Sequence, residues 1–528
     1  MHRYYIYFLT LSLLSLSLNA QQLNERYHFD YPATIFTSLV STDSVYYING
    51  LIADTTFFNQ SSNIFAKVSF EGEMEWLNVI HSPDQTYETW DGDLIDLNGD
   101  GFIINGYGFD TNMFALVLRY DSLGEFMWEE KIRNSFDEED FIRATSLLNI
   151  NDSYLLTLYE VHPDNLVSNE IGLIKLNAEG ETIWRKIYGS PILRDIPFSS
   201  TILNENAYAI GGYIINNHVV DQNYTSRASI FQVDSLGNKQ WEWLSPVDEL
   251  WDAVYGIVAS GDGGLIGVSG NGVEKYVNPE VNFLHWGNPI IFKLNENHDL
   301  VWQRTFDISN MTILDNRLTD IIKSSNEDGF VAIGNYGERF PEIVDSIGVA
   351  EVELSGWILK VSPEGDSLWA RKLKYLNEDG AGAHYLYDIR PTSDGGYILC
   401  GQVRDVELFE HFQQAWLIKV DEYGCVVPGC HLPNNLSEIK KEIPQLLLYP
   451  NPVQDQLHVF LRDYSAYQRE SLTFRVVNQQ GQVIQRLKIN PSEEITYMID
   501  VSSYASGAYF LQYLENTKVI GQETFIVP

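Results

Sequence analysis

One short stretch places oxygen-bearing side chains at alternate positions, a spacing that suits a divalent cation. It reads Asp-Leu-Asn-Gly-Asp-Gly, and Asp96, Asn98 and Asp100 supply the oxygen atoms. Ca²⁺ takes about six to eight oxygen ligands, and a glycine turn lets the chain curl around the ion. Calcium is therefore the one cofactor that the sequence suggests. A plain hairpin turn is the other interpretation of the same residues.

Residues for covalent or metal-assisted catalysis form no recognisable motif. The sequence has no His-Glu-x-x-His pair, no Gly-x-Ser-x-Gly elbow, no phosphate loop and no Gly-x-Gly-x-x-Gly after a strand. No catalytic or cofactor-binding residue is therefore predicted. The 72 acidic side chains still leave room for an acid–base pair that only the folded chain brings together.

The charge of the chain excludes two classes of partner. With 34 basic and 72 acidic side chains, the formal charge is −38. Nucleic acids and anionic lipids are bound through a cationic footprint, so neither is expected as a partner. An acidic surface is typical of an exported protein that must stay soluble.

The elements around these residues come from a repeated hairpin. In its clearest copy, Leu173–Tyr188, two strands with alternating apolar residues flank an Asn-Ala-Glu-Gly turn, and a tryptophan follows the glycine by four residues. Six copies have this tryptophan, nine residues after a Lys, Arg or Gln: Trp76, Trp128, Trp184, Trp241, Trp302 and Trp369. We interpret these rings as packing between neighbouring units, with an aromatic binding platform as the alternative.

A second hairpin lies between successive copies of the first. It consists of an apolar strand, a turn that often contains Asp-Gly, and a strand that ends in glycine, as in Leu386–Gly401. Asp-Gly between alternating apolar runs indicates a hairpin. The two hairpins form a four-stranded unit that recurs seven times, with 52 to 67 residues between tryptophans. Such units pack radially, which predicts an all-β, seven-bladed β-propeller over residues 21–430. An open β-solenoid or stacked sandwiches are the alternatives.

Two of these motifs resemble those of known propeller families. The loop from Asp96 to Gly101 is similar to the FG-GAP calcium loops of integrin-type propellers and to the start of an EF-hand loop. The stretches Asp394–Tyr397 and Trp416–Asp421 resemble those of secreted bacterial propellers that carry a DGGY strand and a W-x-x-K-x-D hairpin. The resemblance implies export and, by analogy, a binding role.

The N-terminus has the composition of a secretory leader. Basic Arg3, an apolar run over Tyr4–Leu18 and a small residue at Ala20 predict a signal peptide over residues 1–20. No later stretch approaches 18 apolar residues, so we expect no membrane span in the mature chain. The following segment, Gln21–Ala33, is predicted to supply the missing outer strand of the last blade and so to close the ring.

The three cysteines of the chain are consistent with one disulfide in an oxidising compartment. Cys425 and Cys430 flank a short Pro-Gly turn, and we expect these two to be bonded. Cys400 lies within a predicted strand, where we expect a buried thiol.

The seven-fold period ends before the C-terminus. Residues 431–445 are polar and read as a linker, and seven short strands over residues 446–528 predict a small Ig-like β-sandwich. This module resembles the type A C-terminal sorting domain of the type IX secretion system of Bacteroidetes. The matching residues are Tyr449, Pro450, Asn451, Pro452, Gly481, Gly507 and Tyr509. The resemblance implies recognition by the outer-membrane translocon after passage through the periplasm, and then release or surface anchoring. An ordinary sandwich with a binding role is the alternative.

Two functional hypotheses follow from the sequence. The first is an exported, cell-surface or extracellular propeller that acts as a binding or adhesion module for a glycan or a protein and has no chemistry of its own. The second is a secreted polysaccharide hydrolase or lyase, which would use carboxylates at the mouth of the axial channel. The identity of the ligand, the oligomeric state and the released or anchored fate are not encoded in any motif.

Overall fold

The computed structural model describes residues 23–53, 61–90, 92–136, 141–151, 153–162, 165–189, 193–216, 225–246, 251, 253–271, 288–306, 316–344, 350–376, 382–405, 413–432, 446–461, 472–479, 481–488, 496–515 and 518–528. These residues contain 35 β-strands and no helix. No segment in the described parts of the chain is a helix that could cross a membrane. The predicted signal peptide and most of the predicted linker lie outside the described residues.

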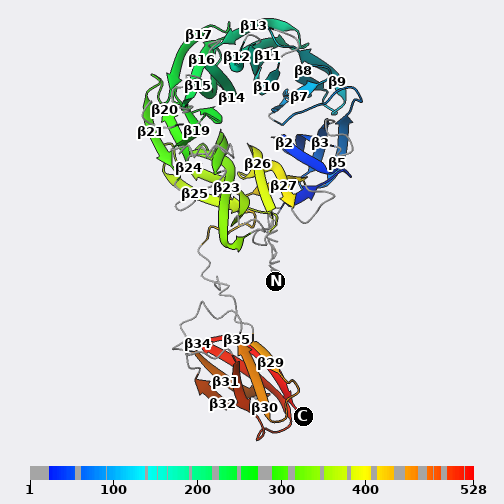
Figure 1. The fold of residues 1–528 in the computed structure, drawn as a ribbon, viewed down its shortest axis with the longest axis vertical. Helices are drawn as coiled ribbons and strands as arrows, with labels where there is room; N and C mark the ends of the chain where they lie inside the picture. Colours follow the sequence, from blue (N-terminus) through cyan, green and yellow to red (C-terminus); the bar gives the residue numbers. More distant parts are fainter. Residues whose placement is uncertain are drawn as a thin grey trace, which may run out of the picture. The chain divides into compact units, whose positions relative to one another are not determined.

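The chain divides into two compact units, Met1–His431 and Leu432–Pro528. In the first unit, antiparallel four-stranded blades surround a common axis (Figure 1). Seven such blades are present, which confirms the predicted propeller.

The blades follow one another in chain order, and each begins with its innermost strand. Blade 1 contains β2 (Ala33–Ser41), β3 (Val45–Ala53), β4 (Ser61–Ser69) and β5 (Met74–Ile80). Blade 2 contains β6 (Leu94–Asp96), β7 (Phe102–Phe109), β8 (Met113–Tyr120) and β9 (Phe126–Ile132). Blade 3 contains β10 (Ile142–Ile150), β11 (Ser153–His162), β12 (Asn165–Asn177) and β13 (Thr182–Tyr188). Blade 4 contains β14 (Leu193–Asn204), β15 (Ala207–Asn216), β16 (Thr225–Asp234) and β17 (Lys239–Leu244).

Blade 5 contains β18 (Gly256–Ala259), β19 (Leu265–Asn271), β20 (Asn288–Leu294) and β21 (Leu300–Thr305). Blade 6 contains β22 (Arg317–Lys323), β23 (Phe330–Val344), β24 (Ala350–Val361) and β25 (Ser367–Leu373). Blade 7 takes three strands from this end of the ring and one from the N-terminus: β26 (Gly382–Pro391), β27 (Tyr397–Asp405), β28 (Gln413–Val420) and β1 (Asn24–Tyr27).

The N-terminal strand closes the ring, as predicted. β1 pairs antiparallel with β28, with Asn24 opposite Ile418 and Tyr27 opposite Ala415. Two side-chain contacts fix this pairing: Trp416 donates its indole N–H to Asn24 Oδ1 at 2.7 Å, and Arg26 pairs with Asp405 at 3.0 Å. The outer edge of β28 is therefore covered, which leaves the last blade with the same four strands as the others.

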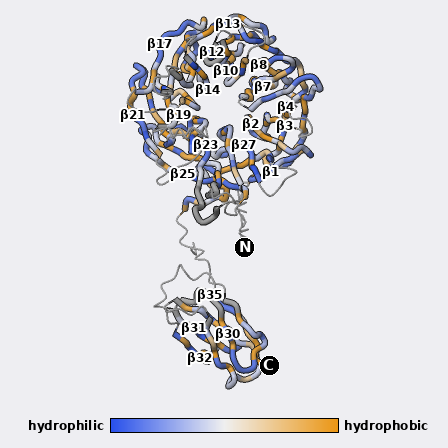
Figure 2. The backbone as a smooth tube through the Cα atoms, viewed as in Figure 1, coloured by the Kyte–Doolittle hydropathy of each residue, from blue (hydrophilic) through white to orange (hydrophobic). Residues whose placement is uncertain are grey.

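Apolar side chains fill the space between neighbouring blades. Seven buried clusters join them, and one of these joins blade 7 to blade 1 through Cys400, Leu417, Phe36 and Ile48. An open row of seven blades would have six such interfaces, so the seventh cluster shows a closed ring. Figure 2 shows hydrophobic stretches along the blades and hydrophilic stretches on outer strands such as β17 and β21.

The second unit is a small β-sandwich, as predicted, with three strands in one sheet and four in the other. The strands are β29 (Leu446–Tyr449), β30 (Gln456–Leu461), β31 (Leu472–Asn478), β32 (Val483–Lys488), β33 (Thr496–Asp500), β34 (Gly507–Glu515) and β35 (Lys518–Val527). The sheets β29-β30-β33 and β32-β31-β34-β35 enclose a core that includes Leu457, Phe474, Ile499 and Phe525.

Removal of β1 tests the closure of the ring. A chain that starts at Asp30 loses buried Leu23 and exposes the edge of β28, so we expect its free energy of unfolding to fall by about 3 kcal/mol or more. Thermal unfolding measures the change. Glu25→Ala is the control, because Glu25 is exposed on the same strand. An unchanged midpoint for the shortened chain would show that β1 does not close the ring.

Candidate functional site

A repeated irregularity of the innermost strands shapes the axis of the propeller. β2, β10, β14, β22 and β26 each contain an extra residue at the same place, with no partner on the neighbouring strand, and β14 has a second one at Leu203. The extra residues of this bulge are Thr37, Thr145, Phe198, Thr319 and Tyr387. A bulge bends its strand and re-aims the side chains that follow it.

Glycine on the second strand makes this bulge fit. A Cβ atom on Gly334 would lie 1.9 Å from the carbonyl oxygen of Arg317, and one on Gly401 would lie 1.8 Å from that of Tyr385. In blades 1 and 4, a Cβ atom on Gly50 or Gly212 would lie 2.1 Å from a carbonyl oxygen of the innermost strand. These contacts are with backbone atoms, so any side chain there would push the two strands apart. The glycine at this place is therefore a packing requirement in blades 1, 4, 6 and 7, whereas blade 3 has Leu158 there.

The residue after the bulge occupies the same place in successive blades, and we call this place the ring position. The described pairing of blade 2 has no bulge, and its ring position is found by aligning Gly106 with the glycines of the other blades. In blade 5 the ring position is Gly256, which lies opposite Val268. From blade 1 to blade 7 the ring position holds Ser38, Asp93, Ser146, Ser199, Gly256, Asp320 and Asp388. Three of the seven blades thus contribute an acid.

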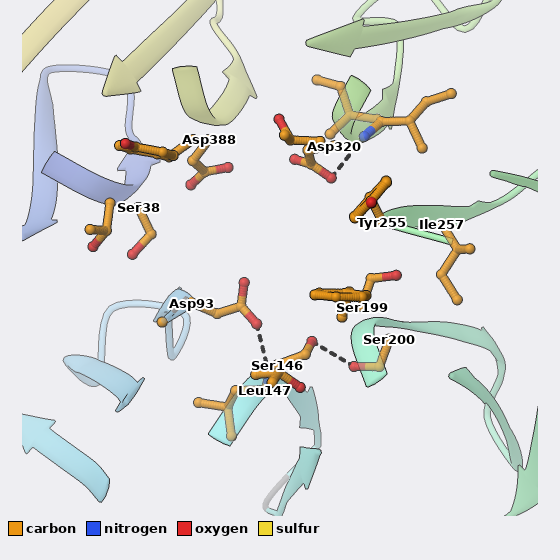
Figure 3. A pocket seen from close by; sticks show the side chains of 18 of the residues that line it. Ser38, Asp93, Ser146, Leu147, Ser199, Ser200, Tyr255, Ile257, Asp320 and Asp388 are labelled. Carbon is orange, nitrogen blue, oxygen red and sulfur yellow. Dashed lines mark hydrogen bonds between the residues drawn. The ribbon is translucent and has the colours of Figure 1, made fainter. Parts of the chain in front are cut away.

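All of these residues except Gly256 line a cavity on the axis with a volume of about 440 Å³. The carboxyl groups of Asp93, Asp320 and Asp388 point into the same space (Figure 3). Aromatic rings also line the cavity: Phe198 and Tyr255 have ring centres 5.2 Å apart, and Trp90 and Tyr387 have ring centres 5.5 Å apart. The cavity therefore combines acidic and aromatic surfaces, which is typical of ligand sites.

Two of the three aspartates also join neighbouring blades. Asp388 Oδ2 accepts a hydrogen bond from the backbone N–H of Leu39 at 2.8 Å, and Asp93 Oδ2 accepts one from Leu147 at 2.7 Å. In both cases the acid belongs to the ring position of one blade. It accepts a hydrogen bond from the residue that follows the ring position in the next blade. Asp320 differs, because it accepts a hydrogen bond from the N–H of Ile321 in its own strand, at 2.8 Å.

Basic groups accompany the acids in the cavity. Arg390 forms an ion pair with Asp388, and about 30% of its side chain stays accessible from the cavity. Burial acts to lower the pKa of Arg390, but Asp388, Asp320 and Asp93 raise it overall. Arg317 also lines the cavity, with its guanidinium 5.9 Å from the centre of the Tyr255 ring.

Burial dominates the ionisation of the acids. It raises the pKa of Asp388 to about 7, where Arg390 opposes the shift and the charge of Asp320 adds to it. It raises the pKa of Asp93 to about 6, with the Leu147 N–H and Arg390 opposing, and it also raises the pKa of Asp320. The nearby Cys400 thiol has a raised pKa for the same reason. The carboxyl groups of Asp388 and Asp93 therefore exchange protons near neutral pH.

The predicted calcium loop lies away from the axis, in the turn between β6 and β7. Asp96 Oδ1 accepts a hydrogen bond from the N–H of Gly99 at 3.0 Å, and the Asp100 side chain is 94% exposed. Arg119 approaches from β8 and donates to the carbonyl oxygen of Asp100 at 2.6 Å. Asn98 has a positive φ of 57° within this hairpin turn. Calcium binding at Asp96, Asn98 and Asp100 stays a prediction.

The six repeat tryptophans also lie away from the axis, on the outermost strands. The ring of Trp76 packs on Gly124 in the turn of the next blade, where a Cβ atom would lie 2.3 Å from the ring. The same contact joins Trp128 to Gly180, Trp184 to Gly237, Trp302 to Gly365 and Trp369 to Gly424. Trp241 stacks on His298 instead, with ring centres 3.7 Å apart. Tyr27 completes the series, since its hydroxyl donates to the Gly72 carbonyl at 2.8 Å.

The cysteines lie near the end of the propeller unit. Cys425 and Cys430 form a disulfide, and Cys400 is a buried free thiol. His431 Nδ1 lies 3.9 Å from the Cys425 sulfur, and the His431 ring stacks on Tyr423.

The sorting-motif residues tie together the ends of the second unit. Asn451 donates to the Thr524 carbonyl and accepts from the Ile526 N–H, each at 3.0 Å, so it holds the last strand as a backbone segment would. Tyr449 stacks on His458, and the peptide bonds before Pro450 and Pro452 are cis.

The other motif positions lie at a turn and in the core. Gly481 has a φ of 80° in the turn between β31 and β32, a conformation that favours glycine. Gly507 begins β34, and the buried Tyr509 stacks on Phe525.

Comparison with known proteins assigns the second unit. Residues 447–527 match the family model of the secretion system C-terminal sorting domain. The chain is a type IX secretion substrate. The sorting domain indicates export to the cell surface or the extracellular space, implies recognition by the type IX machinery, and implies an origin in Bacteroidetes.

The propeller itself has structural neighbours but no sequence relative among curated proteins. The polysaccharide lyase Uly1 is 8% identical over 73% of this chain and 90% of its own, with a TM-score of 0.46. The β-propeller domain of the Trilobed protease from Pyrococcus furiosus is 9% identical over 74% and 99%, with a TM-score of 0.38. The plexin A4 extracellular region is 10% identical over 96% and 67%, with a TM-score of 0.43. At such values the similarity concerns the fold alone.

Sequence reasoning missed the axial aspartates, although it allowed for acids in a channel. A signal was present: when the second hairpins are aligned on their final glycine, Asp93, Asp320 and Asp388 lie 13 or 14 residues before it. The alternation of apolar residues hides this position, because the bulge shifts which side chain faces the axis.

The raised pKa of Asp388 predicts an unusual pH dependence of stability. A carboxyl group that holds its proton more tightly in the folded chain stabilises it at low pH, and this contribution disappears as pH rises through about 7. We expect Asp388→Asn, which no longer titrates, to raise the free energy of unfolding at pH 8 by on the order of 2 kcal/mol relative to wild type. The difference between the two proteins should shrink at pH 5.

Thermal unfolding across this pH range measures the effect. Asp43→Asn is the matched control, because it removes the same charge from an exposed turn. If Asp388→Asn and Asp43→Asn show the same pH profile, Asp388 does not titrate as described.

The sorting domain predicts the outcome of a tail deletion. Without residues 446–528 the chain lacks the unit that the type IX machinery recognises, so it should accumulate inside the cell envelope and disappear from the surface and medium. Fractionation and immunoblotting measure the distribution. Asn451→Ala, which removes only two hydrogen bonds to the last strand, should give a smaller loss. Normal export of the deleted chain would refute a role for the tail.

Proposed function

We propose that the exported propeller is a binding or adhesion module whose ligand site is the axial cavity. The observation that carries the proposal is the convergence of Asp93, Asp320 and Asp388 on one cavity that also has aromatic walls. A pocket of about 440 Å³ suits a small molecule or the end of a longer chain, such as the terminus of a glycan or an exposed side chain of a protein.

The roles of the acids favour binding over catalysis. Asp93 and Asp388 accept backbone hydrogen bonds from neighbouring blades, and Asp388 is also paired with Arg390. Groups held in this way keep a fixed geometry, which suits recognition, while a general acid needs its proton free for transfer.

A polysaccharide hydrolase or lyase is the second candidate. Its support is the set of carboxyl groups with raised pKa values in one cavity, since a pKa of about 6 or 7 suits proton transfer at neutral pH. This candidate requires turnover of a soluble polysaccharide, and Asp93→Asn and Asp388→Asn would each lower that turnover strongly.

A binding screen tests the proposal. The purified full-length protein is applied to a glycan array and to a panel of extracellular proteins, and bound ligands are tested against Ser200→Tyr. Ser200 lines the cavity, so a tyrosine there fills part of it and should weaken binding about tenfold or more. Ser44→Tyr, in an exposed turn, is the matched control and should leave binding unchanged. Equal binding by both variants would place the ligand site elsewhere, and turnover without stable binding would favour the enzyme.

A further inference from the structure

The cavity carries one more acid than it carries bases. Among the residues that the structure describes, its ionisable lining consists of the carboxyl groups of Asp93, Asp320 and Asp388, the guanidinium groups of Arg317 and Arg390, and two tyrosines. When these acids and bases are all ionised, one negative charge stays uncompensated. An uncompensated charge in a partly buried site raises the free energy of the folded protein. Protonation of one carboxyl group is therefore favoured when no cation is bound. A ligand with one positive charge would meet the same need.

The acids are not arranged to hold a single metal ion. Among the described residues, the side-chain oxygens of the three axial acids do not all lie within 4.8 Å of one another. The ligand atoms of Asp421, Cys425 and His431 do, but these residues lie elsewhere. One oxygen each of Asp93 and Asp388 is also engaged by a backbone N–H. A cation that satisfies all three acids must therefore be larger than a bare ion.

The aromatic side chains supply the contact surface for such a cation. Phe198 and Tyr255 pack against each other on one side of the cavity, and Trp90 and Tyr387 pack on another. The faces of aromatic rings attract organic cations, and the carbon atoms around an ammonium nitrogen add apolar contact. A neutral sugar would also stack on these rings, but it would leave the excess charge in place.

We propose that the axial cavity binds a monovalent organic cation, with an amine or quaternary ammonium group that lies among Asp93, Asp320 and Asp388 and packs on the aromatic walls. This inference rests on the proposed binding function and names the chemical class of its ligand. It implies that the cation and a proton compete for the same excess charge. Binding should therefore release up to one proton and strengthen as the pH rises from 5.5 to 8.

Every charged group near the site enters this competition. Arg390 faces all three acids, Arg317 lies beside Tyr255, and the buried Cys400 thiol lies behind Asp388. Cys400 stays neutral because burial raises its pKa, and the two arginines stay charged throughout the range. The acids are thus the groups that change their charge.

Calorimetry with choline as the probe tests the inference on the purified full-length protein. Titrations at pH 5.5, 7 and 8, in buffers of different ionisation enthalpy, give the affinity and the number of protons released. We expect affinity to rise by about tenfold between pH 5.5 and 8, with proton release near pH 7. Myo-inositol, a neutral polyol of similar size, is the control ligand and should bind more weakly.

Two variants separate the ligand site from the fold. Asp320→Asn removes one charge, and the Asp320 carboxyl group is hydrogen-bonded within its own strand, so the variant should fold normally and bind choline about tenfold more weakly. Asp43→Asn, in an exposed turn, should bind like wild type. Loss of choline binding in Asp320→Asn alone supports the inference.

The other outcomes have distinct meanings. If myo-inositol or an array glycan binds in a way that Ser200→Tyr blocks, while choline does not bind, the ligand class is wrong and the proposed binding function stands. If choline binding is independent of pH and of Asp320, the cavity is not the cation site. If neither choline nor any ligand of the screen depends on the cavity, both proposals fail.

Discussion

The close approach of a glycine to a bulged strand sets the geometry at the centre of the propeller. Gly334 and Gly401 lie so near the backbone of the innermost strand that no side chain fits between them. This contact lets the inner strand carry one extra residue, and the residue after it turns to the axis. Because the arrangement recurs around the ring, a difference of one residue between blades changes the lining of the cavity without changing the fold. Asp320 and Ser38 occupy equivalent places for this reason.

Closure of the ring gives this geometry its rigidity. The two ends of the propeller meet where β1 pairs with β28, and a buried cluster joins blades 7 and 1 as other clusters join their neighbours. Asp388 adds a hydrogen bond across the same boundary, to Leu39. Asp93 and Asp388 therefore serve two purposes, since they join blades and line the cavity. A group with both roles is fixed in place, which suits a rigid binding site better than a mobile catalytic one.

The sorting motif and the axial cavity belong to separate units. The sorting domain has its own core, around Leu457, Phe474 and Phe525, and its motif residue Asn451 holds the final strand. Recognition by the export machinery concerns this unit, and the axial cavity belongs to the propeller.

Much of the fold could be predicted from the sequence because its signals are local. A turn glycine followed by Trp184, or Asp394 followed by two glycines, indicates a hairpin within a dozen residues, and counting such hairpins gives the number of blades. The motif around Asn451 was equally local.

The axial site could not be found in the same way. It depends on which of two successive residues faces the axis after a bulge, and apolar alternation does not reveal this. Contacts from a neighbouring strand are hidden as well, as with the guanidinium of Arg119 at the Asp96–Gly101 turn. A motif written in one stretch of sequence says nothing about a side chain that reaches it from another.

Amide hydrogen exchange of the intact exported protein tests the central claim, a closed and uniform ring around an axial site, most directly. Peptides from β2 and β26, which meet at the closure, are compared with peptides from β10 and β14, which meet within the continuous chain. We expect similarly slow exchange in all four, because antiparallel pairing protects each strand and clusters of the same kind fill the interface between blades 7 and 1 and the interface between blades 3 and 4. Exchange in β2 and β26 that is faster by orders of magnitude would show an open ring and contradict this claim.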